Sequence, residues 1–114
     1  MSLRRGLRCL MLAGMLLGVS CDSFFEMYGT VCECGTDTGI PQASGKAVLD
    51  DYPGVPAEVF ATDNAGNYRF GFNAPRTDSA TVTFEKAGYV PIARQFKGIP
   101  NDPTRVDFCM DRAP

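Results

Sequence analysis

The sequence of 114 residues contains no histidine. Serine and cysteine nucleophiles in hydrolases commonly pass their proton to a histidine, and catalytic zinc is commonly held by histidine side chains. The missing residue type therefore excludes Ser-His-Asp and Cys-His mechanisms, and it excludes zinc hydrolysis at histidine ligands. We expect no catalytic residues, no metal site and no cofactor.

Basic residues are scarce after the first eight positions. Three of the 11 bases are Arg4, Arg5 and Arg8, which leaves eight bases against all 13 acids in the part after residue 20. That part carries a net charge of −5. Nucleic-acid-binding surfaces need clustered positive charge to neutralise phosphates. We therefore expect no nucleic-acid partner.

The N-terminal segment has the layout of an export signal. The three arginines precede an apolar run at residues 10–19, which is too short to cross a membrane as a helix. The segment does not end in an Ala-x-Ala-like cleavage site. Instead, Gly18-Val19-Ser20-Cys21 resembles the lipobox of bacterial lipoproteins. A buried core helix and an unprocessed cysteine behind an ordinary signal are the alternatives.

The lipobox resemblance implies cleavage before Cys21 and attachment of palmitate-type acyl chains to that residue. Each buried methylene contributes about 0.8 kcal/mol, so two or three acyl chains hold a small domain stably at a membrane. We divide the sequence into a lipoprotein signal peptide with a signal helix (1–20), a lipidated tether (21–27) and a folded domain (28–114). The expected location is the bacterial cell envelope, with the anchor on the exported side of a membrane and the leaflet left open.

The rest of the chain consists of short apolar runs separated by Gly- and Pro-containing turns. Seven such runs are expected to be strands, at residues 27–33, 46–49, 58–62, 67–72, 79–86, 89–96 and 105–110. Several alternate with period two, which buries one face of a strand and exposes the other. The pattern predicts an all-β, Greek-key sandwich of the prealbumin-like or Ig-like kind. The side chains expected to point inward are Tyr68, Phe70 and Phe72, Ala80, Val82 and Phe84, Val90, Ile92 and Phe96, and Val106, Phe108 and Met110.

Five segments of the domain together resemble the carboxypeptidase regulatory-like domain: Gly29-Thr30-Val31, residues 38–41 (TGIP), Ala47-Val48, residues 61–70 (ATDNAGNYRF) and residues 85–89 (EKAGY). This resemblance implies a transthyretin-like sandwich without catalytic activity over residues 29 to 110.

The turn residues of that resemblance also make physical sense by themselves. Gly66 can adopt the positive φ that ends a turn, and the Asp63 carboxylate can accept backbone N–H groups within it. Gly88 lets the chain bend so that Tyr89 turns back towards the sheet. We expect these four residues to serve the fold and not a reaction.

The front of the mature chain is similar to small lipoproteins associated with radical-SAM enzymes. The similarity rests on the lipobox cysteine, the short acidic tether and Met27-Tyr28-Gly29-Thr30, and it implies a radical-SAM protein as a partner or modifier. Together these observations predict a lipid-anchored, non-enzymatic cell-envelope module that interacts with a protein or a glycan.

Three cysteines remain after the signal peptide and the anchor are set aside: Cys32, Cys34 and Cys109. An inward Val31 sends Cys32 and Cys34 outward, and an inward Phe108 sends Cys109 outward. We predict a disulfide from Cys109 to Cys34 or Cys32, with Cys34 preferred because it stands where its strand ends. The alternative is a metal-binding or thiol-redox lipoprotein that uses all three thiols.

Overall fold

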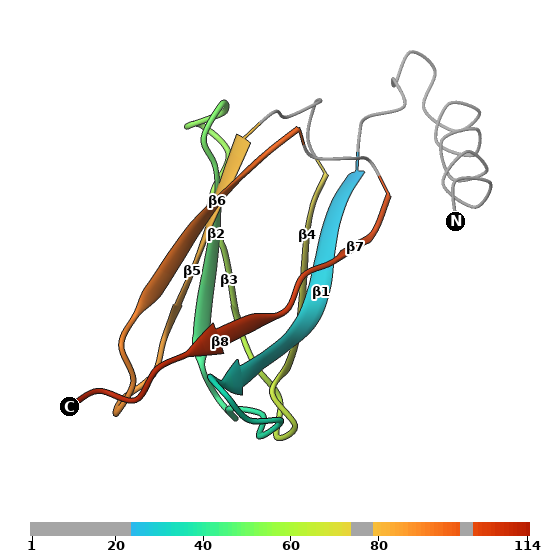
Figure 1. Cartoon of the computed structure of the whole chain (residues 1–114). Helices are drawn as coiled ribbons and strands as arrows, with labels where there is room; N and C mark the ends of the chain where they lie inside the picture. The colour runs from blue at the N-terminus through green and yellow to red at the C-terminus, as the bar shows by residue number, and fades with distance from the viewer. Residues whose placement is uncertain (1–23, 74–78, 99–101) are drawn as a thin grey trace, which may run out of the picture.

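A computed structural model describes residues 24–73, 79–98 and 102–114. The described residues contain eight strands and no helix (Figure 1). The predicted signal helix and Cys21 lie outside them. The strands are β1 (Phe24–Glu33), β2 (Ser44–Leu49), β3 (Glu58–Ala61), β4 (Asn67–Asn73), β5 (Ser79–Glu85), β6 (Ile92–Lys97), β7 (Thr104–Arg105) and β8 (Phe108–Met110).

Two four-stranded sheets form the sandwich that the sequence predicts. One has the order β3-β2-β5-β6, and in the other β1 lies between β4 on one side and β7 and β8 on the other. β1 is antiparallel to β4 and parallel to β7 and β8. In Figure 1, β1 runs nearly the full height of its sheet. It is therefore the strand on which the other three strands of its sheet are assembled.

Strand boundaries differ most from the prediction at three places, and β2 also begins two residues earlier than expected, at Ser44. β1 begins at Phe24 and pairs with β4 from there, so residues 24–27, predicted as tether, belong to the sandwich. The expected last strand is divided into β7 and β8, because the Asp107 carboxylate takes the Thr30 N–H at 3.0 Å in place of a backbone carbonyl. The sixth strand begins at Ile92, since the Val90 N–H is used by the carbonyl of Asp111 in the C-terminal tail.

Eight of the twelve side chains predicted to point inward lie in the core, and Ile92, Phe96 and Val106 are partly buried against it. Val90 is the exception. Tyr68, Phe70 and Phe72 are each 4% exposed, whereas Val90 is 43% exposed and was wrongly expected inside. Among the described residues, fifteen buried apolar side chains make up the core. Its aromatic rings pack closely, with the Phe84 and Phe108 centroids 5.0 Å apart, and the partly buried Phe60 ring packs against Phe70 at 4.8 Å. This continuous cluster joins the two sheets.

Two loops that carry the turn motifs meet at one end of the sandwich. Gly66 has φ 85°, and its carbonyl accepts the Val31 N–H at 2.8 Å. A Cβ on Gly66 would lie 2.7 Å from the Cα of Gly39 and from the Val31 oxygen. The buried Thr62 hydroxyl donates to the Ile40 carbonyl at 2.6 Å. These contacts leave no room for a side chain at Gly66.

Candidate functional site

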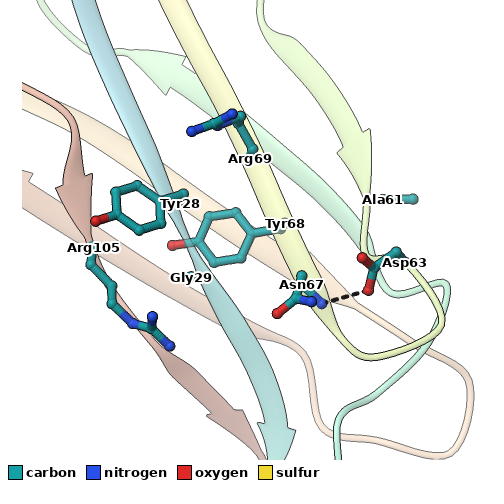
Figure 2. Close-up of a pocket in the computed structure, with 8 residues that line it drawn as sticks. All are labelled: Tyr28, Gly29, Ala61, Asp63, Asn67, Tyr68, Arg69 and Arg105. Carbon is teal, nitrogen blue, oxygen red and sulfur yellow. Dashed lines mark hydrogen bonds between the residues drawn. The ribbon is translucent and has the colours of Figure 1, made fainter.

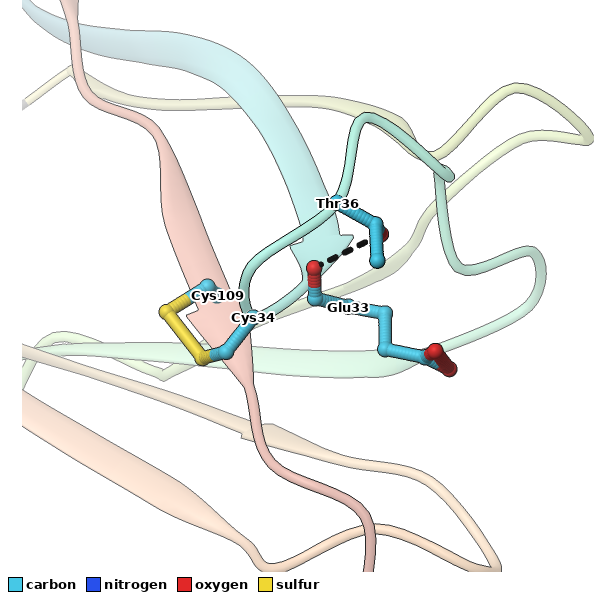
Figure 3. The surroundings of a disulfide bond; sticks show 4 residues. All are labelled: Glu33, Cys34, Thr36 and Cys109. Carbon is cyan, nitrogen blue, oxygen red and sulfur yellow. Dashed lines mark hydrogen bonds between the residues drawn. A yellow bond between two sulfur atoms is a disulfide. The ribbon is translucent and has the colours of Figure 1, made fainter.

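The structure joins Cys34 to Cys109 by the predicted disulfide (Figure 3). The two Cα atoms are 4.7 Å apart, and 75 positions separate them in sequence. The Cys34 N–H also donates to the Met110 carbonyl at 3.1 Å, so the end of β1 is held to β8 both covalently and by the backbone. Stable disulfides are typical of proteins in oxidising, exported environments.

Cys32 is the cysteine that the described residues leave free. It is half-buried, and it lies opposite Cys109 in the parallel register of β1 and β8. The bridge occupies two of the three thiols that an all-thiolate metal site would need. Within the described ranges, no three His, Cys, Asp or Glu side chains are grouped closely enough to hold a metal ion.

The turn at Gly88 and Tyr89 closes the same end of the molecule. Gly88 has φ 89°, and its carbonyl accepts the Ala113 N–H at 2.9 Å. The Tyr89 hydroxyl donates to Glu33 Oε1 at 3.0 Å, which raises the pKa of that hydroxyl. Arg112 Nε donates to the same Glu33 oxygen at 2.8 Å. These side chains fix the C-terminal tail against β1 and the turn.

The turn at Asp63 is built as the sequence suggests. Its Oδ1 accepts the N–H groups of Ala65 and Asn67, each at 2.9 Å. The Asn67 N–H is the main cause of a lowered pKa at Asp63. The carboxylate therefore serves to order the loop between β3 and β4.

A groove of about 350 Å³ crosses the outer face of the β1 sheet and reaches the Asp63 turn (Figure 2). Its chemical groups come mainly from a single row across three strands, because Tyr28 on β1 is paired with Arg69 on β4 and with Arg105 on β7. Below the row, the buried Tyr68 hydroxyl donates to the Val106 carbonyl at 2.6 Å. Burial raises the pKa of Tyr68, so its phenol stays protonated and part of the fold.

Both arginines of the row are held by a carboxylate. Arg69 Nε lies 2.7 Å from Glu26 Oε2, and Arg105 Nε lies 3.3 Å from Asp107 Oδ1. The Thr30 backbone N–H is the main cause of a lowered pKa at Asp107, so this partner stays ionised. The Arg69 guanidinium lies 5.9 Å from the centre of the Tyr28 ring. The row thus presents two oriented guanidinium groups on either side of an aromatic ring.

Sequence reasoning identified the cysteines and the turn residues but missed this groove. Arg69 was recognised only as the outward residue of its strand. Tyr28 was noted only within the Met27-Tyr28-Gly29-Thr30 similarity, and Arg105 only as the start of the last predicted strand. Their meeting depends on the register of β1 with two partners that are distant in sequence. Only a correct strand pairing would have brought the three side chains together.

No family profile and no curated protein matches the chain. None of the described segments is a helix with the length and hydropathy of a membrane span. Solved structures nevertheless share the architecture. The chain is similar to chlorocatechol 1,2-dioxygenase from Pseudomonas putida, with a TM-score of 0.65, 15% identity, and coverage of 83% of this chain and 63% of that one.

Two further structural neighbours come from other bacteria. The C-terminal domain of the shaft pilin SpaA from Lactobacillus rhamnosus GG gives a TM-score of 0.58 at 14% identity, covering 81% of this chain and all of that domain. A candidate carbohydrate-binding protein from Bacteroides uniformis ATCC 8492 gives a TM-score of 0.53 at 15% identity, covering 75% of this chain and 40% of that one. The chain spans less than two thirds of the dioxygenase and of the Bacteroides protein. At these identities the comparisons establish a shared β-sandwich fold.

Proposed function

We propose that this protein is a lipid-anchored, non-enzymatic module of a bacterial cell envelope that binds a protein or a glycan. The observation that carries the proposal is the placement of β1. The strand starts three residues after Cys21 in sequence and forms the middle of its sheet. Its ten residues span about 30 Å at roughly 3.3 Å per residue. An acylated Cys21 would seat one end of the sandwich at the membrane and direct the disulfide-closed end outward.

The disulfide and two of the structural neighbours are consistent with the same assignment. A Cys34–Cys109 bridge is consistent with an exported domain. A pilin domain and a candidate carbohydrate-binding protein share the sandwich, and both descriptions are compatible with a module that works through its surface. The radical-SAM partner remains a prediction from the sequence similarity.

Substitution of Cys21 by alanine tests the anchor. We expect Cys21→Ala to abolish labelling by a palmitate analogue and to move the protein out of the membrane fraction, because the acylated side chain is gone. Cys9→Ala is the matched control, since Cys9 lies within the predicted signal peptide, and it should be labelled like wild type. Normal acylation of Cys21→Ala would refute the lipobox assignment.

Mild crosslinking on intact cells tests the interaction itself. Recovery of one specific envelope protein or glycan with wild-type protein, and its loss when the protein is released from the membrane by Cys21→Ala, would support the module. Absence of any crosslinked partner, protein or glycan, would contradict it.

A thiol-redox function is the alternative, favoured by the position of Cys32 opposite Cys109. In that case the Cys32 thiolate attacks Cys109 Sγ, a Cys32–Cys109 bond forms, the Cys34–Cys109 bond breaks and Cys34 leaves as a thiolate. Peptide mapping of oxidised Cys34→Ser separates the two functions. A Cys32–Cys109 bridge favours exchange, whereas two free thiols leave the interaction module as the assignment.

A further inference from the structure

The row formed by Arg69, Tyr28 and Arg105 presents hydrogen-bonding groups that make no contact needed for the fold. The two arginine side chains are 71% and 57% exposed, although each is held in place by its carboxylate. Both carboxylates contact the Nε side of the guanidinium. The Nη groups have no protein partner among the described residues. Each guanidinium is therefore an oriented plane with free donors.

A second set of an arginine, a carboxylate and a tyrosine in this molecule serves only to stabilise the fold. Arg112 is also paired through Nε with a glutamate, Glu33, and lies 5.6 Å from the centre of the Tyr89 ring. There, however, the tyrosine hydroxyl is bonded to the same glutamate. The Tyr28 hydroxyl has no hydrogen bond within the described part of the chain. A second arginine also flanks Tyr28 across the opposite strand pair.

The charge balance around Tyr28 selects the kind of ligand. Each guanidinium is already neutralised by a carboxylate, Glu26 for one and Asp107 for the other. The part of the chain after residue 20 is acidic overall, so the long-range field disfavours polyanions. An uncharged polyhydroxylated ring fits better, because its apolar face can lie on an aromatic side chain while its hydroxyl groups meet fixed donors and acceptors. The volume of about 350 Å³ lies within the usual range of small-ligand sites.

We propose that the groove around Tyr28 binds a neutral glycan, with Tyr28 as the platform for a sugar ring and Arg69 and Arg105 as hydroxyl-binding groups. This inference rests on the proposed function, and it names the ligand class and the site. Tyr28 supplies the apolar contact and an unpartnered hydroxyl. The two guanidinium groups supply directional hydrogen bonds from either side of the ring. Figure 2 shows the three side chains along one face of the sheet.

Protein purified from membranes in detergent is first applied to an array that contains neutral and acidic glycans, and affinities for the hits are then measured by calorimetry. Maltohexaose, cellohexaose and mannohexaose serve as neutral probes, and hexagalacturonate serves as the acidic probe. We expect a neutral probe to bind and Tyr28→Ala to weaken that binding at least about tenfold. Tyr28→Phe should retain most of the affinity because it keeps the ring.

The arginines are tested against a matched control. Arg69→Gln and Arg105→Gln should each weaken binding about tenfold through loss of fixed donors. Arg112→Gln removes an equally exposed, equally paired arginine outside the groove and should bind like wild type. All five substitutions are at four residues whose side chains are exposed or half-buried. An intact Cys34–Cys109 bridge and a melting temperature close to that of wild type report correct folding.

The results that would contradict the glycan site can be told apart from those that would contradict the proposed envelope module. Binding that depends on salt and prefers hexagalacturonate would overturn the assignment to neutral glycans. Neutral binding that survives Tyr28→Ala and Arg105→Gln would place the site elsewhere. Absence of binding to every neutral glycan would refute the inference, while a crosslinked envelope protein would still support the module. Absence of both would refute the two proposals together.

Discussion

Gly66 and Gly88 separate two reasons for which a protein retains glycine. Their φ angles are nearly equal, 85° and 89°, and both lie in the left-handed region. A Cβ on Gly88 would meet nothing within 4 Å, whereas a Cβ on Gly66 would press on backbone atoms of Gly39, Val31 and Ile40. Gly88 is therefore needed for its conformation alone, and Gly66 is needed for its conformation and for close packing.

Alanine substitutions should reveal this difference. We expect Gly88→Ala to lower the free energy of unfolding by about 1–2 kcal/mol, the usual cost of a left-handed alanine. Gly66→Ala should cost about 3 kcal/mol or more, because backbone neighbours must also shift. Urea unfolding of both variants measures the two costs. Equal losses would show that the contact between the loops at Gly39 and Gly66 is unimportant for stability.

At the residue scale, the sequence predicts those contacts that join residues close to one another in the chain. The Asp63 turn was predictable because its hydrogen bonds reach only two and four residues along the chain. The contact of Gly66 with Gly39 spans two loops and follows from the assembled fold. Val90 was assigned to the core because it continues an alternating pattern. Its backbone N–H instead donates to the Asp111 carbonyl in the C-terminal tail.

At the scale of elements, β1 determines the architecture of its sheet. Period-two patterning located the strands and their inner faces, because alternation is a property of each strand alone. The pairing of β1 with β7 and β8 could not be read in the same way. A side chain, Asp107, substitutes for the backbone between these two short strands, and Gly29 is required there because a Cβ would collide with the Val106 carbonyl. The groove at Tyr28 depends on this pairing and was missed for the same reason.

The disulfide between β1 and β8 should contribute strongly to stability. Cys109→Ser opens a loop of 75 positions, and the chain-entropy model gives a loss of about 4 kcal/mol. Denaturant unfolding of oxidised wild type and of the variant measures this loss. Cys32→Ser is the control and should unfold like wild type, because Cys32 is not in the bridge. A Cys109→Ser protein as stable as wild type would mean that the bridge adds nothing to stability.

At the scale of the whole molecule, three aspartates spread over the sandwich respond to acid together. The pKa values of Asp50, Asp63 and Asp107 are all lowered, chiefly by the Ser79 hydroxyl, the Asn67 N–H and the Thr30 N–H respectively. An aspartate whose pKa is lowered by folding stabilises the folded state at pH values above its unfolded-state pKa of about 3.9. This stabilisation is lost as the pH falls through the lower pKa of the folded state.

The melting temperature should therefore be nearly constant from pH 8 to pH 5 and fall below about pH 4. The flat range follows from the absence of histidine, the side chain that ordinarily titrates there. Asp63→Asn combined with Asp107→Asn keeps acceptor oxygens but removes two titrating groups, so its melting temperature should depend less on pH between 4 and 2. Calorimetric scans at each pH check this. The same acid dependence in wild type and the double variant would assign acid unfolding to other groups.

The disulfide has a mechanical consequence. β1 leads from the N-terminal end of the described domain directly to Cys34, and Cys109 lies five residues before the last residue of the chain. Tension applied between the two chain ends would travel along β1, cross the sulfur–sulfur bond and leave through the tail. Residues 35–108 lie outside this covalent load path. A pull strong enough to unravel an unbridged sandwich would extend this domain by little more than the length of its first strand and tail.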